Sequence, residues 1–298
     1  MAFRSGFVSI IGRPNSGKST LLNSLVGEKI AIVTHKPQTT RSNIQGMVNL
    51  PAMKGHPAGQ IIFVDTPGVH KPGTSLNRHM MDQVRQALGQ CDLILLLIDV
   101  TQPFGAGDKF VLDMLKRYRS QIFLVLNKID RIAKEKLLPL IAKYTELRSF
   151  AEVLPISALK KQGLDLLLER VVAALPEGPQ LFPEDQLTDQ SERALVAELV
   201  REKVLQHAGQ EVPYASAVEI EQFETKPKLT RVAAAIYCER EGQKAILIGK
   251  GGQMLKKIGA AARYEIEKRL GTKVYLELFV KVRPGWRGMR EFVEGVQQ

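Results

Sequence analysis

The sequence predicts an α/β protein: a doubly wound, mainly parallel sheet followed by a small α+β domain. Three observations lead to this fold class. Five short, almost continuously apolar runs alternate with amphipathic stretches over the first 175 residues, which is typical of strands covered by helices on both faces. Within the stretch 176–189, the first eight residues include three prolines and one glycine. Beyond it, the pattern predicts the order helix, two strands, two helices and a strand.

The elements of the first domain follow from the spacing of its apolar residues. Strands are expected at 7–11, 61–64, 93–98, 122–126 and 153–156. Between them apolar residues recur three and four positions apart, as on the packed face of a helix. Helices are therefore expected after residue 19 and near 76–88, 108–117, 135–148 and 163–174.

The remaining elements set the domain boundaries. Prolines cannot continue a helix, so we expect a first domain at 1–175, a linker at 176–189 and a second domain at 190–298. In the second domain a helix begins near Ser191. It is followed by strands at 215–223 and 231–238, an apolar turn at 245–248, a helix at 253–270 and a strand at 273–282.

Composition and charge narrow the function classes. The 298 residues are 44% hydrophobic and 24% charged, as in ordinary globular proteins. The longest aliphatic run, 93–98, is far below the ~20 residues of a membrane span, and no secretory signal is expected. Cys91 and Cys238 lie in apolar surroundings and are expected to be buried, reduced thiols, as in a cytosolic protein.

The net charge of +11 is unevenly distributed along the chain. Residues 181–225 carry a net charge of −7, whereas residues 226–298 carry +9. The basic end predicts a localised surface for a polyanion. Basicity alone does not separate RNA, DNA and anionic lipid.

Residues 12–19, GRPNSGKS, match the pattern G-x-x-x-x-G-K-[ST] between an apolar strand and a helix. Glycines let main-chain N–H groups surround a phosphate, and the helix presents its positive end to it. Lys18 is expected to reach the β- and γ-phosphates, and the Ser19 hydroxyl to bind Mg²⁺. The nucleotide-binding residues predicted in this loop are Gly12, Asn15, Ser16, Gly17, Lys18, Ser19 and Thr20.

A second motif, DTPG at 65–68, follows the expected strand 61–64. Asp65 is expected to hold Mg²⁺ through a water, and the Gly68 N–H to meet the γ-phosphate. Thr40 is assigned to Mg²⁺ and the γ-phosphate, with Thr39 as the alternative. The predicted metal ligands are thus Ser19, Thr40 and Asp65, and the predicted catalytic residues are Lys18, Thr40 and Gly68.

Base recognition is expected from Asn127, Lys128 and Asp130 of the sequence NKID, which follows strand 122–126. The Asp130 carboxylate can accept hydrogen bonds from N1–H and N2–H₂ of guanine, donors that adenine lacks. A site built to bond such groups rejects analogues without them by ~10⁴–10⁵. Ser157 and Ala158 follow strand 153–156 and are expected to offer a main-chain N–H to guanine O6.

These elements, in this order, resemble those of the translation-factor-like P-loop GTPases. The resemblance implies slow intrinsic hydrolysis, on the order of 10⁻³ s⁻¹ or less, because Val69 stands where many relatives carry a water-orienting glutamine. In related GTPases an asparagine at the position of Asn15 helps to hold K⁺. Our hypothesis is that K⁺ supplies positive charge here; the alternative is that Asn15 merely caps the loop.

A second binding site is predicted at the sequence IGKGG, 248–252. A GXXG loop lets a nucleic-acid backbone approach closely, and the following helix points its N-terminus at phosphates. With the α-β-β-α-α-β order, this segment resembles a type II KH domain, which binds about four nucleotides of single strand. The predicted RNA-binding residues are Ile248, Gly249, Lys250, Gly251, Gly252, Lys256, Lys257 and Ile258, the two isoleucines supporting bases.

Basic residues near the C-terminus could extend that surface. They are Lys281, Arg283, Arg287 and Arg290, with Trp286 available to stack on a base. A solvated tail and a packing anchor are equally open interpretations of these charges and of the tryptophan.

A GTPase followed by a type II KH domain resembles the Era family over nearly the full length, including the run KPQTTR at 36–41 and SAL at 157–159. The resemblance implies a Mg²⁺-dependent GTPase that binds small-subunit (16S) ribosomal RNA near its 3′ end. It also implies a role in 30S assembly, control of RNA access by the GTP state, and a cytoplasmic monomer with a peripheral inner-membrane fraction.

Two other functions are compatible with parts of this sequence. One is a tRNA-modification or membrane-remodelling GTPase with a basic tail, but no basic amphipathic helix stands out beyond the KH pattern. The other is an RNA-binding module with a degenerate GTPase, against which the intact Lys18, Asp65 and Asp130 argue.

Overall fold

The computed structural model describes residues 2–36, 38–53, 56–70, 74–209 and 212–296; Pro37, within the run KPQTTR, lies outside them. Of the described residues, those within 1–31, 40–72 and 79–189 form one compact unit. Those within 32–39, 73–78 and 190–298 form the other.

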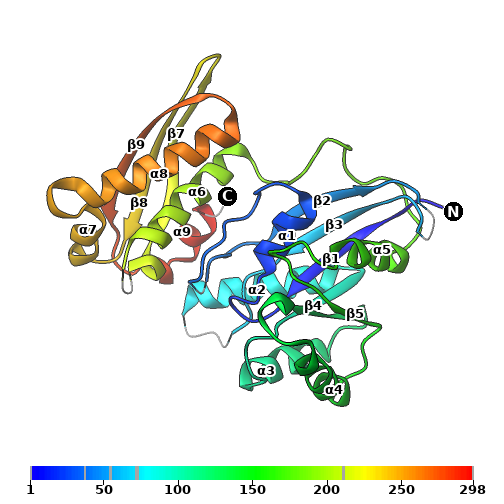
Figure 1. Ribbon diagram of the computed structural model, residues 1–298. Helices are drawn as coiled ribbons and strands as arrows, with labels where there is room; N and C mark the ends of the chain where they lie inside the picture. The colour runs from blue at the N-terminus through cyan, green and yellow to red at the C-terminus, as the bar shows by residue number, and fades with distance from the viewer. Residues whose placement is uncertain (1, 37, 54–55, 71–73, 210–211, 297–298) are drawn as a thin grey trace. The chain divides into compact units, whose positions relative to one another are not determined.

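The first unit is built on a six-stranded sheet with the order β2-β3-β1-β4-β5-β6 (Figure 1). The β2 strand runs antiparallel to β3, and all other neighbours are parallel. This confirms the doubly wound, mainly parallel sheet. The strands are β1 Arg4–Ile11, β2 Ile44–Leu50, β3 Gly59–Asp65, β4 Leu93–Asp99, β5 Gln121–Asn127 and β6 Glu152–Pro155.

Helices cover both faces of this sheet because its strands are apolar on both sides. Side chains of β4 alternate between two cores: Leu95 and Leu97 pack with residues of α1 and α5, whereas Ile94 and Leu96 pack with residues of α2, α3 and α4. The helices are α1 Lys18–Val26, α2 Ser75–Gln90, α3 Ala106–Leu115, α4 Leu137–Leu147 and α5 Leu164–Ala174, with 3₁₀ turns at Ile129–Arg131 and Lys134–Lys136.

The edge strand β2 was not predicted. Its sequence, IQGMVNL, is interrupted by polar residues and glycine, so it lacks the continuous apolar run of a central strand. The stretch predicted as a linker lies beside it. The Met47 N–H donates to Leu187 O at 3.0 Å, and the Thr188 hydroxyl donates to Gln45 O at 2.7 Å.

The second unit is a three-stranded sheet, β7-β8-β9, with β7 antiparallel and β9 parallel to β8. Its order α6-β7-β8-α7-α8-β9 confirms the predicted α+β arrangement. The elements are α6 Glu192–His207, β7 Ala217–Lys226, β8 Leu229–Cys238, α7 Glu241–Ile248, α8 Gln253–Leu270, β9 Lys273–Val282 and α9 Arg290–Gly295, with 3₁₀ turns at Val212–Ala215, Lys250–Gly252 and Trp286–Gly288. The expected apolar turn at 245–248 is instead the end of helix α7.

The core of the second unit lies between this sheet and helices α6 and α8. Ile258, Ala262 and Ile266 of α8 are fully buried against strand residues such as Ala234 and Ile236. These residues recur three and four positions apart, which aligns one apolar face of α8 with the sheet.

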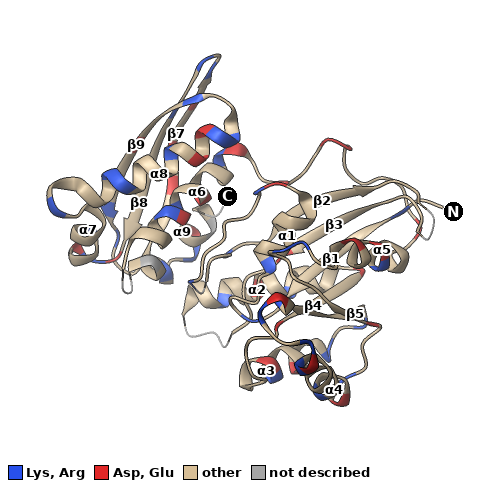
Figure 2. Cartoon of the chain, in the orientation of Figure 1, with Lys and Arg blue, Asp and Glu red and all other residues tan. Residues whose placement is uncertain are grey.

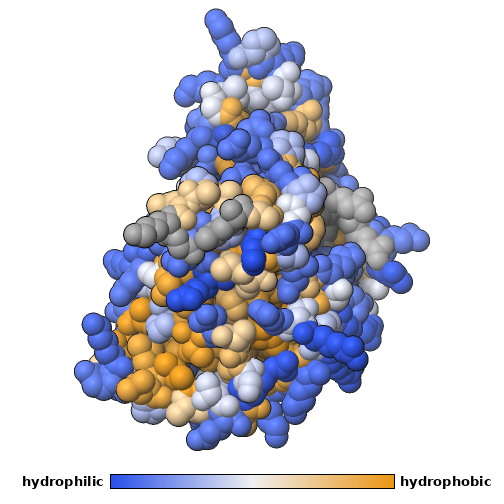
Figure 3. Space-filling view, turned by 90° about the vertical axis from the view of Figure 1, so that its right-hand side faces the viewer, coloured by the Kyte–Doolittle hydropathy of each residue, from blue (hydrophilic) through white to orange (hydrophobic). Residues whose placement is uncertain are grey.

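Helix hydropathy and cysteine burial are two further properties of the described residues. No helix in the described part of the chain is long and apolar enough to cross a membrane. Both cysteines are buried free thiols, and burial raises the pKa of each. Apolar side chains gather in the lower part of the face drawn in Figure 3. Leu138 and Leu147 of α4 are exposed.

Candidate functional site

The predicted nucleotide site lies at the edge where parallel strands of the first sheet end. The loop 12–19 follows β1, Asp65 ends β3, Asn127 ends β5 and Ser157 follows β6. Ligands of open α/β sheets bind outside this edge because the carboxyl ends of parallel strands converge there.

The loop 12–19 takes a backbone that its residue types permit. Gly17, the residue before α1, has φ +98°, and Asn15 has φ +63°. A Cβ on Gly17 would also lie 2.4 Å from Asn127 Nδ2. Glycine is therefore required at position 17 for both the left-handed backbone and the close approach of Asn127.

Three oxygen-bearing side chains meet beside this loop. The Ser19 hydroxyl donates to Asp65 Oδ2 at 2.6 Å, and the Thr40 hydroxyl is 3.2 Å from the same oxygen. The two hydroxyl oxygens lie 2.9 Å apart. The other oxygen of Asp65, Oδ1, is buried and accepts no hydrogen bond from the described residues. Hard oxygen donors grouped in this way, with one carboxylate oxygen not yet engaged, fit a magnesium ion that also binds phosphate and water.

The buried cation of the site is Lys18. Its ammonium donates to Arg13 O at 3.2 Å and Gly12 O at 3.4 Å. Burial lowers the pKa of Lys18 and raises that of Asp65; the attraction between these opposite charges works against both shifts. An anion placed within the loop would therefore stabilise the protonated ammonium.

The geometry favours Thr40 over Thr39 as the threonine that meets Mg²⁺ and the γ-phosphate. The Thr39 hydroxyl bonds within its own loop, to Thr34 Oγ1 at 2.8 Å and Lys36 O at 2.7 Å. Gly68 approaches the phosphate loop so closely that a Cβ would lie 2.9 Å from Pro14. Val69 is 2% exposed and packs in the apolar core, so its side chain offers nothing to a water.

Asn127 fastens the base-recognition segment to the phosphate loop. Its Nδ2 donates to Ser16 O at 2.9 Å, and its Oδ1 accepts from the Ala158 N–H at 3.0 Å. Of the two residues expected to offer an N–H to guanine O6, Ser157 donates its N–H to Gln162 O at 3.0 Å, and Ala158 donates its N–H to Asn127. A base oxygen would have to share that donor or displace Asn127 from it.

Asp130, the carboxylate predicted to recognise guanine, is exposed and held by a short contact. Its Oδ1 accepts a hydrogen bond from the Ser157 hydroxyl at 2.5 Å. Ser157 is fully buried, so it anchors one oxygen and leaves Asp130 facing solvent. The loops after β5 and β6 are thus brought together as predicted.

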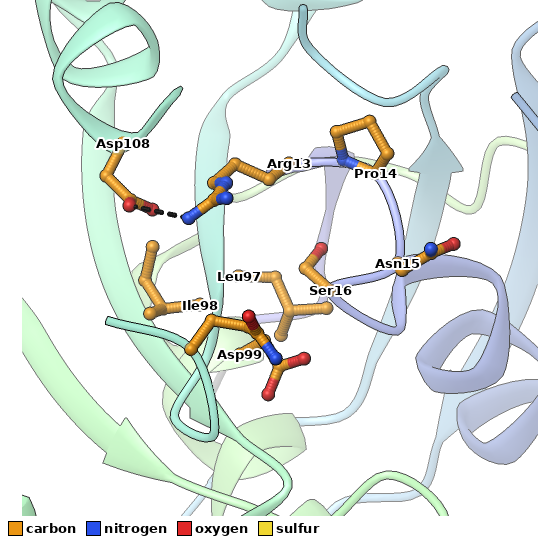
Figure 4. Close-up of a pocket in the computed structure, with 9 residues that line it drawn as sticks. Arg13, Pro14, Asn15, Ser16, Leu97, Ile98, Asp99 and Asp108 are labelled. Carbon is orange, nitrogen blue, oxygen red and sulfur yellow. Dashed lines mark hydrogen bonds and ion pairs between the residues drawn. The ribbon is translucent and has the colours of Figure 1, made fainter. Parts of the chain in front are cut away.

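Sequence reasoning missed two ion pairs around the phosphate loop. Arg13 donates to Asp108 at 2.9 Å, and Lys128 pairs with Asp99 at 2.6 Å. Arg13, Asp99 and Asp108 line a cavity of about 300 Å³ beside the loop, together with Pro14, Asn15, Ser16, Leu97, Ile98 and Gln102 (Figure 4). No motif signals these pairs, because their partners are far apart in the sequence.

The second predicted site is the glycine loop between α7 and α8. Gly249, Gly251 and Gly252 have φ of +71°, +58° and +78°. A Cβ on Gly249 would lie 2.7 Å from Met254 Cβ, whereas nothing lies within 4 Å of the Cβ positions of Gly251 and Gly252. The loop is therefore closely packed at its start and open at its end, where a ligand backbone could approach.

Lysines surround the open part of this loop. Lys250, Lys256 and Lys257 are exposed, and Figure 2 shows basic residues on the loop and at the start of α8. Ile248 is partly exposed beside them. Ile258 requires a correction: it was expected to support bases, but it is fully buried in the core beneath α8.

The basic C-terminal residues are largely engaged within the second unit. Trp286 is a packing anchor, 1% exposed, with its indole N–H donating to Ala215 O at 3.0 Å. Lys281 pairs with Glu221 and Arg287 with Glu239. The Arg283 guanidinium lies 4.0 Å from the centre of the Phe292 ring.

The fold and both sites define a P-loop GTPase that carries a KH domain. The family described as "50S ribosome-binding GTPase" matches residues 7–128, and the KH domain family matches residues 211–287. GTPase Era of Ruminiclostridium cellulolyticum is 49% identical over 288 residues, covering 96% of this chain and 95% of the relative. Era of Syntrophus aciditrophicus is 50% identical over 296 residues, covering 97% and 95%.

Solved structures agree. Era in complex with MgGDPNP and nucleotides 1506–1542 of 16S ribosomal RNA superposes with a TM-score of 0.93 at 41% identity, covering 99% of this chain and 98% of that one. An Aquifex aeolicus Era variant bound to GDP·AlF₄⁻ has a TM-score of 0.92 at 41% identity, covering 98% of each. The chain belongs to the Era family of GTPases.

Base recognition by Asp130 is testable through a change of nucleobase. Asp130→Asn replaces an acceptor pair by one acceptor and one donor, which matches xanthine better than guanine. We expect GTP affinity to fall by at least a hundredfold and XTP to become the preferred nucleotide. Competition binding of GTP and XTP measures this; retained preference for GTP would contradict the assignment.

Proposed function

We propose that this protein is a GTP-dependent switch that binds single-stranded 16S ribosomal RNA near its 3′ end and acts in assembly of the 30S subunit. The observation that carries the proposal is the presence, in one chain, of the Ser19–Thr40–Asp65 cluster and the open, lysine-flanked GKGG loop. The related Era structure contains both a GTP analogue with Mg and a 16S ribosomal RNA fragment.

The residues of the nucleotide site fit a Mg²⁺-bound nucleotide. Ser19 and Thr40 would hold the ion, and Asp65, whose Oδ2 contacts both hydroxyls, would act on it through a water. The bound ion would supply positive charge between the β- and γ-phosphates. Lys18 would neutralise the same phosphates, and the Gly68 N–H would bond the γ-phosphate. Because Val69 cannot orient water, intrinsic hydrolysis would be slow.

Coupling between the two sites is supported by the loop at 32–40, whose residues are divided between the two units. Residues within 32–39 belong to the second unit: the Val33 N–H donates to Glu202 Oε1 at 3.1 Å, and Arg201 of α6 donates to Thr39 O. The next residue, Thr40, bonds Ser19 and Asp65 in the first unit. A change in Thr40 on hydrolysis would therefore act on a loop that α6 holds.

We further propose that the protein works in the cytoplasm as a monomer, with a peripheral fraction at the inner membrane. The net charge of +9 on residues 226–298 supports contact with anionic surfaces, ribosomal or lipid. The tRNA-modification and membrane-remodelling alternative finds no structural feature in its favour.

RNA binding is tested by reversing charge at the loop. We expect Lys250→Glu to weaken binding of a single-stranded RNA with the 16S 3′-end sequence by at least about tenfold and to flatten its salt dependence, because a phosphate contact is lost. Lys268→Glu, an equal charge change at the exposed far end of α8, is the matched control. Equal effects of the two variants would contradict a specific loop site.

Coupling is tested by measuring the affinity for the same RNA with a non-hydrolysable GTP analogue, with GDP and without nucleotide. We expect the GTP analogue to change RNA affinity relative to GDP, because it alone orders Thr40 against Mg²⁺. Lys18→Ala, which should abolish GTP binding while RNA binding persists, should remove the difference. Identical affinities in the three states of the wild type would show that the sites are uncoupled.

We propose that K⁺ assists hydrolysis at the position of Asn15, which is exposed with φ +63°. Turnover of GTP is expected to be faster in KCl than in NaCl at equal ionic strength, because the ion adds positive charge beside the phosphates. Asn15→Ala should abolish the difference. Equal rates of the wild type in both salts would remove the proposal and leave Asn15 as a structural residue.

A further inference from the structure

A carboxylate that no motif predicted lies beside the nucleotide site. Asp99, the last residue of β4, accepts a hydrogen bond from the Lys128 ammonium at Oδ2, 2.6 Å away. The same ammonium donates to the main-chain oxygen of Asn15 in the phosphate loop at 2.8 Å. The Asp99 side chain is 13% exposed and that of Lys128 25%, so solvent only partly screens this ion pair.

The sheet fixes Asp99 relative to the NKID motif. Asp99 and Asn127 are register partners in the parallel pair β4–β5, and the Val100 N–H donates to Asn127 O at 3.1 Å. Lys128 follows directly and has φ +70°. The carboxylate and the lysine therefore leave adjacent strand ends, and main-chain hydrogen bonds hold them together.

We propose that Asp99 is a positioning residue for guanine-nucleotide binding, which acts by holding the Lys128 ammonium against the Asn15 carbonyl. A lysine side chain has a flexible four-carbon stem and samples many rotamers when its ammonium is unrestrained. Here two acceptors restrain it. Through this one cation, the segment that carries Asp130 is joined to the loop that binds phosphate, so base and phosphate are bound by parts held at a fixed separation.

Asp99 also has a local contact, which provides the competing explanation. Its other oxygen, Oδ1, accepts from the Thr101 N–H at 3.0 Å and the Thr101 hydroxyl at 2.6 Å. These bonds close the turn after β4. If the turn were the whole role of Asp99, its loss would lower folding stability without a specific link to Lys128.

Asp99→Asn separates the two roles. An asparagine can keep its carbonyl oxygen toward Thr101, whereas its amide nitrogen cannot accept a hydrogen bond from an ammonium. In the full-length protein with Mg²⁺, we expect a fluorescent GDP analogue to dissociate roughly tenfold faster from Asp99→Asn than from the wild type. Lys128→Met should accelerate dissociation at least as much, and the double variant should dissociate no faster than Lys128→Met alone, since the two residues act as a unit.

Two controls complete the experiment. Asp92→Asn removes a carboxylate just before β4, at the opposite end of the strand from Asp99. Asp92 Oδ2 accepts a hydrogen bond from the Phe7 N–H of β1 at 2.8 Å, and GDP dissociation from this variant should equal that from the wild type. Thr101→Val disturbs the turn without touching Lys128. The proposal is overturned if Asp99→Asn releases GDP at the wild-type rate, if its effect adds to that of Lys128→Met, or if Thr101→Val accelerates release equally. The same assay also measures whether the wild type binds GDP. Absence of that binding would contradict the nucleotide site itself, whereas the outcomes above concern only the role of Asp99.

Discussion

The nucleotide site depends on the contacts of one fully buried carboxylate, that of Asp65. One of its oxygens accepts hydrogen bonds from both Ser19 and Thr40, and the other has no partner within the described part of the chain. Burial raises the pKa of Asp65 and lowers that of Lys18, so without ligand each charged group is unfavourably placed. A magnesium ion would offset the desolvation cost of the Asp65 carboxylate, and phosphates would offset that of the Lys18 ammonium, because each brings an opposite charge close to the buried group.

The parallel sheet explains why such distant residues meet. Strands β1, β3, β5 and β6 run in the same direction, so the segments that follow them emerge at one edge. Hydrogen bonds then join those segments: Asn127 to Ser16 and Ala158, Ser157 to Asp130, and Lys128 to Asn15. Each loop restrains the next, which gives a pre-organised site built on a rigid sheet.

The glycine loop of the second unit follows a different principle. Its glycines adopt left-handed backbone conformations, and the Cβ positions of Gly251 and Gly252 are open to solvent. Binding there would rest on close approach to main chain and on exposed lysines rather than on buried polar contacts. The packed core of the second unit lies below the surface of this loop and includes the buried Ile258 and Trp286.

The sequence alone determined the fold class, the order of the central elements and the residues of the motifs. These features are local: an apolar run predicts a central strand, and the residue types of GRPNSGKS or GKGG permit only a few backbone conformations. The α8 and β9 boundaries, 253–270 and 273–282, were predicted correctly because their apolar periods are uninterrupted.

Tertiary structure alone decided the rest. It placed the edge strand β2, whose polar residues interrupt the apolar pattern, and it made Trp286 a buried packing anchor. It gave the Ala158 N–H to Asn127 and paired Asp99 with Lys128 across 29 positions of sequence. Such partners are chosen by strand register and by which side chains remain near one another after the core has packed, and a pattern read along one chain carries no information on either.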